Sequence, residues 1–273
     1  MIDPVIDAAI AEDIGAGDMT SQALIPADER YHGTLRVRES AVVAGLAVAE
    51  RVFHKIEPGC SFQSNTKDGE RLGAGDIIAE VRGPARGLLT AERTALNFLQ
   101  HLSGIATVTR TYVDRIVGTG AVLLDTRKTI PGLRVLEKYA TRMGGATNHR
   151  MRLDDAVLIK DNHIAVSGSI AEAVKRARDA GLSPIEVECD TLDQVEESVA
   201  AGAEIIMFDN MDTKTLVKAV ALVGDKAKTE ASGGVNLDSI RAIAETGVDT
   251  ISVGRITQSA PAVDIGLDWL TEV

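Results

Sequence analysis

Apolar and polar positions follow two different patterns along this chain. In the first 105 residues the helical and strand-like stretches are short and mixed. The spacing predicts helices over residues 2–14 and 47–56, and strands over 34–38, 61–66 and 77–82. A polar turn is expected at residues 18–21, after the glycines that end the first helix. This part of the chain indicates a mixed α/β module with short connections.

From residue 121 onward, runs of four or five apolar residues alternate with amphipathic helical stretches. The expected strands are 122–125, 156–160, 185–188, 205–208, 228–231 and 250–253. The expected helices are 133–143, 169–180, 192–201, 213–223 and 237–246. Because apolar strands joined by helical crossovers form buried parallel sheets, this half predicts an α/β barrel. Six strands are fewer than a full set of about eight, so the barrel is either incomplete or contains a strand that the pattern hides.

The change of pattern divides the chain into two expected domains. We expect an N-terminal domain over residues 1–105 and a barrel over residues 106–273. A helix over 88–105 and a second helix through residue 116, separated at Gly104, are expected to connect them. The apolar face of the first of these helices is wide, which leaves open whether part of it forms a subunit interface.

Polar residues follow the expected strands of the second half at the point where each strand ends. These are Asp125 to Lys128, Lys160 to Asn162, Glu188, Asp209 with Asn210, Ser232 to Gly234, and Gly254. Since the carboxyl ends of barrel strands form the rim where chemistry takes place, we expect these side chains to converge. Glycine-rich turns after the last two strands suit a phosphate, because bare backbone N–H groups can approach its oxygens.

Charge and composition narrow the class of ligand. The chain has a formal net charge of −11, yet residues 121–163 contain eight Lys or Arg against five Asp or Glu. A local positive region in an acidic chain favours a small anionic ligand. Acidity and an aromatic content of 3% argue against nucleic-acid binding. Cys60 and Cys189 match no metal or redox spacing, and no signal peptide or membrane-spanning run is apparent, so a cytoplasmic location is expected.

The candidate site combines cations with two carboxylates. The cations are Arg93, Arg127, Lys128, Arg150 and Lys160, which suit carboxylate and phosphate groups. Glu188 and Asp209 could hold Mg²⁺, bind sugar hydroxyls or stabilise an oxocarbenium charge, and the pattern does not decide between these roles. Lys160 could also form a Schiff base with a carbonyl substrate.

The histidines of this region do not have zinc-site spacing. His149 stands next to Arg150, and we expect it to donate a hydrogen bond to an anion. His163 follows Lys160 closely, and its role remains open between a structural and a functional one.

Long motifs in this chain resemble the quinolinate phosphoribosyltransferase family. They are DTRKTxPGxR (125–134), GGxxNHR (144–150), LIKDNHI (158–164), EVE ending at Glu188, MFDNM (207–211) and ASGG (231–234). EDIGAGDMTS (12–21) and ERTALNFLQHLSGIAT (92–107) extend the resemblance over nearly the whole chain. Three positions depart from the family pattern, since Ala146 replaces a usual glycine, Arg255 a more apolar residue and Gln258 a histidine.

The resemblance implies an N-terminal open α/β sandwich domain and a C-terminal incomplete, TIM-like α/β barrel, with residues 265–273 packing back on the first domain. It further implies a homodimer in which Arg93 reaches into the partner's active site. The implied reaction, in NAD biosynthesis, joins quinolinate to 5-phosphoribosyl-1-pyrophosphate and gives nicotinate mononucleotide, pyrophosphate and CO₂, with Mg²⁺.

The resemblance also implies a role for each site residue. Quinolinate would be held by Arg93, Arg127, Lys128, His149 and Arg150, with Thr126 beside them. The phosphoribosyl donor would be bound by Lys160, Glu188 and Asp209, the last two holding Mg²⁺ directly or through water. Its 5′-phosphate would lie against Ser232, Gly233, Gly234, Ser252, Val253 and Gly254. Lys128, Lys160, Glu188 and Asp209 are the implied catalytic residues.

Three other readings of the sequence remain. One is a relative of the same fold, of the kind found with molybdate-transport genes, that acts on another base. The full set of residues that suit a dicarboxylate, Arg127, Lys128, His149 and Arg150, argues against it. The second is an aldolase or isomerase that uses Lys160 as a Schiff-base lysine. The third is a non-catalytic binding homologue, against which the intact strand-end residues argue.

Overall fold

The computed structural model describes residues 2–270 and divides the chain into two compact units. Unit 1 comprises residues 1–110, 130–145 and 259–273, and unit 2 comprises 111–129 and 146–258. The chain therefore returns twice to unit 1 after entering unit 2. This interleaving differs from two consecutive segments, and the local apolar pattern carries no sign of it.

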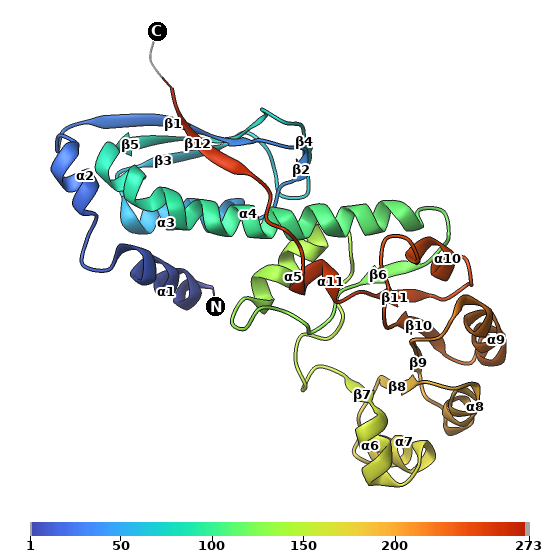
Figure 1. Ribbon diagram of the computed structural model, residues 1–273. Coiled ribbons are helices and arrows are strands. Elements are labelled where there is room, and N and C mark those ends of the chain that lie inside the picture. Colours follow the sequence, from blue (N-terminus) through green and yellow to red (C-terminus); the bar gives the residue numbers. More distant parts are fainter. Residues whose placement is uncertain (1, 271–273) are drawn as a thin grey trace. The chain divides into compact units, whose positions relative to one another are not determined.

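Unit 1 is built on an antiparallel sheet with the strand order β12-β1-β5-β3 (Figure 1). Its elements are α1 (Asp3–Ile14), α2 (Met19–Leu24), β1 (Arg30–Val37), β2 (Ala41–Val42), α3 (Leu46–Ile56), β3 (Ser61–Ser64), β4 (Arg71–Leu72), β5 (Ile77–Pro84), most of α4 (Ala85–Ile116), α5 (Arg134–Met143) and β12 (Ile265–Trp269). In the register, Leu35 of β1 stands opposite Leu267 on one side and Ala79 on the other. The central strand is thus paired along both edges.

The C-terminal segment joins this sheet. β12 pairs with β1 in antiparallel register from Ile265↔Val37 to Trp269↔Gly33, and the Leu270 amide donates to the His32 carbonyl at 2.9 Å. The packing expected for residues 265–273 can be followed as far as Leu270, and residues 271–273 lie outside the described residues.

Two expected breaks in unit 1 are wrong. The polar turn at 18–21 is the start of α2, where the Asp18 side chain caps the helix by accepting from the Ser21 amide at 2.9 Å. α4 continues through Gly104 without interruption. A Cβ at Gly104 would collide with the Pro261 carbonyl oxygen, so this glycine permits close packing of the 261–262 backbone.

The apolar face of α4 is used inside its own unit. Leu88, Leu99 and Leu102 are at most 1% exposed and belong to the core cluster of unit 1. The wide apolar face read from the sequence is therefore core surface along these positions, because the sheet of unit 1 supplies its packing partners.

Unit 2 contains a parallel sheet with the order β6-β11-β10-β9-β8-β7, as the pattern predicts (Figure 1). Its elements are β6 (Val122–Leu124), β7 (Val157–Ile159), α6 (Asp161–Ser167), α7 (Ile170–Asp179), β8 (Ile185–Cys189), α8 (Leu192–Ala201), β9 (Ile205–Asp209), α9 (Thr213–Val223), β10 (Lys228–Ser232), α10 (Ile240–Ala244), β11 (Thr250–Ser252) and α11 (Arg255–Gln258). The expected α/β class is confirmed, with an antiparallel sheet in the N-terminal part and a parallel sheet in the C-terminal part.

The helix boundaries of unit 2 follow from capping residues. α8 and α9 have the expected bounds, and their N-caps Thr191 and Asp212 accept backbone hydrogen bonds from Gln194 and Thr215. A residue with a short polar side chain before an apolar periodic run is the local signal for such a start. Over residues 2–270, no helix combines the length and apolar character that a membrane crossing requires.

Candidate active site at the carboxyl ends of the parallel strands

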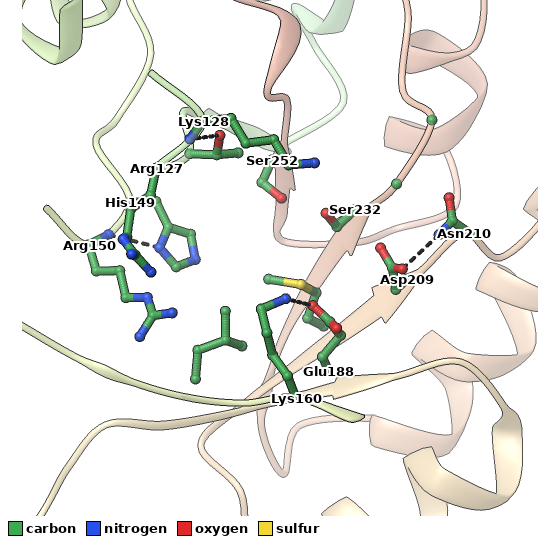
Figure 2. Close-up of a pocket in the computed structure, with 15 residues that line it drawn as sticks. Arg127, Lys128, His149, Arg150, Lys160, Glu188, Asp209, Asn210, Ser232 and Ser252 are labelled. Atoms are coloured by element: carbon green, nitrogen blue, oxygen red, sulfur yellow. Dashed lines mark hydrogen bonds and ion pairs between the residues drawn. The ribbon is translucent and has the colours of Figure 1, made fainter. Parts of the chain in front are cut away.

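A cavity of about 500 Å³ opens where the strands of the parallel sheet end (Figure 2). It is lined by Thr126, Arg127, Lys128, His149, Arg150, Leu158, Lys160, Glu188, Met207, Asp209, Asn210, Ser232, Gly233, Gly234 and Ser252. The polar residues at the carboxyl ends of β6, β7, β8, β9 and β10 thus converge as expected. All lining residues belong to unit 2.

Asp125, directly after β6, holds the segment that supplies two of the lining residues. Its side chain is fully buried, and its carboxylate accepts from the Asn148 side chain at 2.5 Å and from the His149 amide at 2.9 Å. Thr147 extends the sheet beside β6 through a parallel bridge to Leu124. A buried carboxylate that accepts backbone and amide hydrogens fixes this segment, and with it His149 and Arg150, at the cavity wall.

Three cations line one side of the cavity. The Arg150 guanidinium is anchored by a 3.0 Å hydrogen bond from Nη1 to the Ala156 carbonyl. The Lys128 backbone is fixed on both sides, because its amide donates to Thr126 Oγ1 and its carbonyl accepts from Thr257 Oγ1. Burial, and then the charge of Arg127, lower the pKa of Arg150. Two guanidinium groups that repel one another form a site that an anion stabilises.

Lys160 and Glu188 form an ion pair across the cavity floor (Figure 2). Lys160 Nζ donates to Glu188 Oε2, and the Glu188 side chain is 16% exposed against 42% for Lys160. The Lys160 amide donates to His163 Nδ1 at 2.9 Å, where α6 begins. The ring of His163 therefore caps this short helix, which favours the structural role for it.

The corner after β9 fixes Asp209. Asn210 has a positive φ of 55°, and its side-chain Nδ2 donates to Asp209 Oδ2 at 2.6 Å. Gly233, with φ 85°, packs against it so closely that a Cβ there would lie 2.7 Å from the Asn210 amide nitrogen. Only glycine accommodates both this contact and this φ without strain.

Glu188 and Asp209 are the residues that fit a magnesium ion. Each commits one oxygen to a neighbour, Glu188 Oε2 to Lys160 and Asp209 Oδ2 to Asn210, and their other oxygens accept no hydrogen bond from residues 2–270. Mg²⁺ typically takes one or two protein carboxylates and completes its shell with water and substrate phosphates. The two carboxylates therefore fit a magnesium ion.

Two buried carboxyl groups lie behind His149. Glu186 on β8 and Glu230 on β10 are 4% and 2% exposed, and His149 Nε2 is 3.3 Å from Glu186 Oε2 and 3.6 Å from Glu230 Oε1. Burial, and then the Glu186 charge, raise the pKa of Glu230 to about 7. The other ring nitrogen, Nδ1, accepts from the Arg150 amide at 2.8 Å. Both ring nitrogens of His149 thus face protein groups, although the sequence analysis expected a donor to an anion.

The structure brings together most of the site residues predicted from sequence. Val253 and Gly254 stand beside the cavity without lining it: the Val253 amide donates to the Leu124 carbonyl, and a Cβ at Gly254 would lie 2.8 Å from Lys128 Cδ. Arg93 belongs to unit 1, where it lines a different cavity of about 280 Å³ with residues of α1 and α2.

Sequence reasoning did not assign four residues of this region: Leu158, Met207, Glu186 and Glu230. A signal for the two glutamates was available, since each is a charged residue inside an otherwise buried strand. Such positions carry a function or a partner, because an isolated buried charge is unfavourable. The apolar residues carry no comparable sequence signal.

Comparisons with known proteins identify one family over nearly the whole chain. The model of the quinolinate phosphoribosyl transferase N-terminal domain matches residues 18–103, and that of the C-terminal domain matches residues 105–268. A Mycobacterium leprae protein named nicotinate-nucleotide pyrophosphorylase (carboxylating) is 44% identical over 270 residues, which cover 96% of this chain and 95% of that protein.

Solved structures show the same similarity. The nicotinate-nucleotide pyrophosphorylase from Francisella tularensis matches with a TM-score of 0.95 and 41% identity, covering 98% of this chain and 96% of that one. The protein of the same name from Ehrlichia chaffeensis also gives 0.95 and 41%, covering 99% of each chain.

Proposed function

The chain belongs to the quinolinate phosphoribosyltransferase family, and from this premise we propose which of its residues carry out the reaction. It has nicotinate-nucleotide pyrophosphorylase (carboxylating) activity in NAD biosynthesis. In this reaction quinolinate and 5-phosphoribosyl-1-pyrophosphate give nicotinate mononucleotide, pyrophosphate and CO₂. The observation that carries the residue assignment is the single cavity in which cations, two carboxylates and glycine-rich turns meet.

Quinolinate is a dicarboxylate, and the cation side of the cavity suits it. Arg127, Lys128 and Arg150 would pair with its carboxylates, with Thr126 and His149 forming the adjacent wall. Guanidinium groups favour planar, bidentate contacts and so fix the orientation of the ring. Positioning of this kind can lower a bimolecular barrier by several kcal/mol, about 7 or more in favourable cases.

The phosphoribosyl donor would occupy the opposite side. Lys160, Glu188 and Asp209 would bind its ribose and pyrophosphate, and the turns Ser232–Gly234 and Ser252–Gly254 its 5′-phosphate. Lys128, Lys160, Glu188 and Asp209 are the proposed catalytic residues. Once the ring nitrogen carries ribose it is cationic, and that charge stabilises loss of the adjacent carboxylate, so no separate electron sink is required.

Magnesium is the proposed cofactor. Glu188 and Asp209 would hold it, directly or through water, by the oxygens not committed to Lys160 and Asn210. When bound, Mg²⁺ would neutralise phosphate charge. The residues of the chain orient the two carboxylates whether or not the ion is present.

A Schiff-base role for Lys160 is less well supported by the geometry. Its side-chain nitrogen is engaged in an ion pair with Glu188, whereas a Schiff-base lysine must present that nitrogen to a substrate carbonyl. We also propose that the first boundary between the two domains lies near residue 105, and that the protein is cytoplasmic. The rice and Arabidopsis relatives are named as chloroplastic proteins, so location varies among them.

The reaction itself tests the assignment. With Mg²⁺, 5-phosphoribosyl-1-pyrophosphate and quinolinate, we expect CO₂ and nicotinate mononucleotide to appear in equal amounts, and nicotinate to fail as a substrate. If neither product forms, the base that this cavity accepts is a different one, and a borohydride-trapped adduct on Lys160 would favour the Schiff-base alternative.

We propose a homodimer in which Arg93 of one subunit completes the active site of the other. This residue is absent from the cavity of unit 2, and its helix α4 could present it to a second copy. Arg93→Ala and Lys160→Ala chains, each inactive alone, are expected to recover up to about a quarter of wild-type activity after subunit exchange, since random mixing restores one intact site in such dimers. Exchange proven by mass-tagged chains without recovered activity would contradict the shared site.

A further inference from the structure

The group formed by His149, Glu186 and Glu230 is not explained by the substrate contacts. Its three potential ligand atoms all lie within 4.8 Å of one another inside unit 2. Glu186 Oε1 and Glu230 Oε1 have no hydrogen-bond partner among the described residues. Two carboxylates this close and this buried cannot both remain ionised at low cost, because each disfavours the charge on the other.

The hydrogen bond at Nδ1 fixes the tautomer of His149 (Figure 2). Nδ1 accepts from the Arg150 amide at 2.8 Å, so it carries no proton. The proton of the neutral imidazole is then on Nε2, which faces both carboxyl groups. A metal ion bound at Nε2 would require that proton to move to Nδ1, where the Arg150 N–H occupies the lone pair. The arrangement thus favours a proton over a metal ion at Nε2 of His149.

We infer that Glu186 and Glu230 are positioning residues for the reaction: Glu186 accepts the Nε2 proton of a neutral His149, and Glu230 is held in its protonated form. The inference rests on the proposed function of the cavity. Glu186 is the nearer acceptor, at 3.3 Å from Nε2 against 3.6 Å for Glu230. The raised pKa of Glu230 is consistent with this division of roles.

The groups that act on Glu230 come from each element around it. Glu186 on β8 disfavours its ionised form, while His149 and the hydroxyls of Thr250 and Ser252 on β11 favour it. Thr250 Oγ1 lies 3.5 Å from Glu230 Oε2. Burial and the like charge outweigh these groups, since the net shift is upward.

The consequence is an anion site whose charge depends on Glu230. With Glu230 neutral, the pair of Glu186 and Glu230 places one negative charge, instead of two, behind the cations of the cavity wall. Ionisation of Glu230 would add a second negative charge close to a dianionic substrate, in an environment of low dielectric constant. Binding of quinolinate is therefore expected to weaken as the pH rises through the pKa of Glu230, about 7.

Ring-nitrogen NMR of the wild-type protein tests the tautomer without any measurement of activity. The ¹⁵N signals of His149, assigned by their loss in His149→Gln, are expected to show an unprotonated Nδ1 and a protonated Nε2 from about pH 6 to pH 8. An imidazolium at about pH 7, the opposite tautomer, or selective loss of the Nε2 proton on addition of Zn²⁺ would overturn the inference.

The pH dependence of the kinetics of Glu230→Gln tests whether Glu230 is protonated. Glutamine reproduces the shape and neutrality of a protonated glutamate, so this variant is expected to match the wild type near pH 6 and to keep a flat kcat/KM for quinolinate up to about pH 8.5. The wild type is expected to lose about tenfold over the same range, one factor of ten corresponding to about 1.4 kcal/mol. Glu186→Gln, which removes the acceptor charge, is expected to lose about tenfold already near pH 6.

A matched control is Glu196→Gln, at an exposed position of α8, which should follow the wild-type pH profile. Equal alkaline losses in wild type and Glu230→Gln would refute the protonated Glu230. Formation of no nicotinate mononucleotide by the wild type would instead refute the proposed function, while the NMR result would still decide the tautomer.

Discussion

Replacing Arg150 by alanine is expected to lower kcat/KM for quinolinate by about a thousandfold, or about 4 kcal/mol. The guanidinium lines the cavity and is anchored by its 3.0 Å hydrogen bond to the Ala156 carbonyl. Its removal leaves a substrate carboxylate without this charged partner at the cavity wall. Steady-state kinetics with quinolinate varied at saturating donor measure the effect, and the loss should fall mainly on KM for quinolinate.

Two variants show whether this loss is specific. Arg150→Lys keeps the charge but not the planar pair of donors, and an intermediate loss of about thirtyfold is expected. Arg152→Ala is the matched control, because that side chain is 73% exposed and pairs with Asp154 at the surface. It should stay within about twofold of wild type. Near-normal kinetics of Arg150→Ala, or a low melting temperature that accounts for its loss, would remove Arg150 from the substrate site.

Replacing Glu188 by glutamine is expected to lower kcat by about a thousandfold or more. The change removes the partner of Lys160 and one of the two carboxylates that fit Mg²⁺, while keeping the shape of the side chain. Because ion, donor and lysine would all meet at this carboxylate, any accompanying rise in KM should be seen for the phosphoribosyl donor and not for quinolinate. A shift of the Mg²⁺ dependence to higher concentration is expected as well.

A double variant tests whether Glu188 and Lys160 act together. If the pair acts as one unit, the double variant Lys160→Ala with Glu188→Gln should be about as impaired as either single variant, instead of showing the product of two losses. Asp190→Asn, an exposed position just past β8, provides the control and should leave the kinetics unchanged. Losses that multiply would show that the two residues act separately.

The sequence alone determined the elements that depend on local patterns. The bounds of α8 and α9 could be read directly, because a capping residue and a helical apolar period lie within a few residues of each other. The polar residues at the strand ends also predicted most of the cavity wall, since parallel strands deliver their carboxyl ends to one edge. Motif order along the chain indicated the family.

Tertiary structure decided what depends on residues distant in sequence. In the sequence Gly104 resembles a helix break, whereas the structure shows an unbroken helix with the Pro261 carbonyl packed against this glycine. Segments 130–145 and 259–273 join unit 1 through contacts with residues that are distant in the sequence. Glu186 and Glu230 lie on strands more than forty residues apart in the sequence, and His149 joins them from a third segment. Burial and the electrostatic coupling of these groups are properties of their distances in space, which no local pattern of residues encodes.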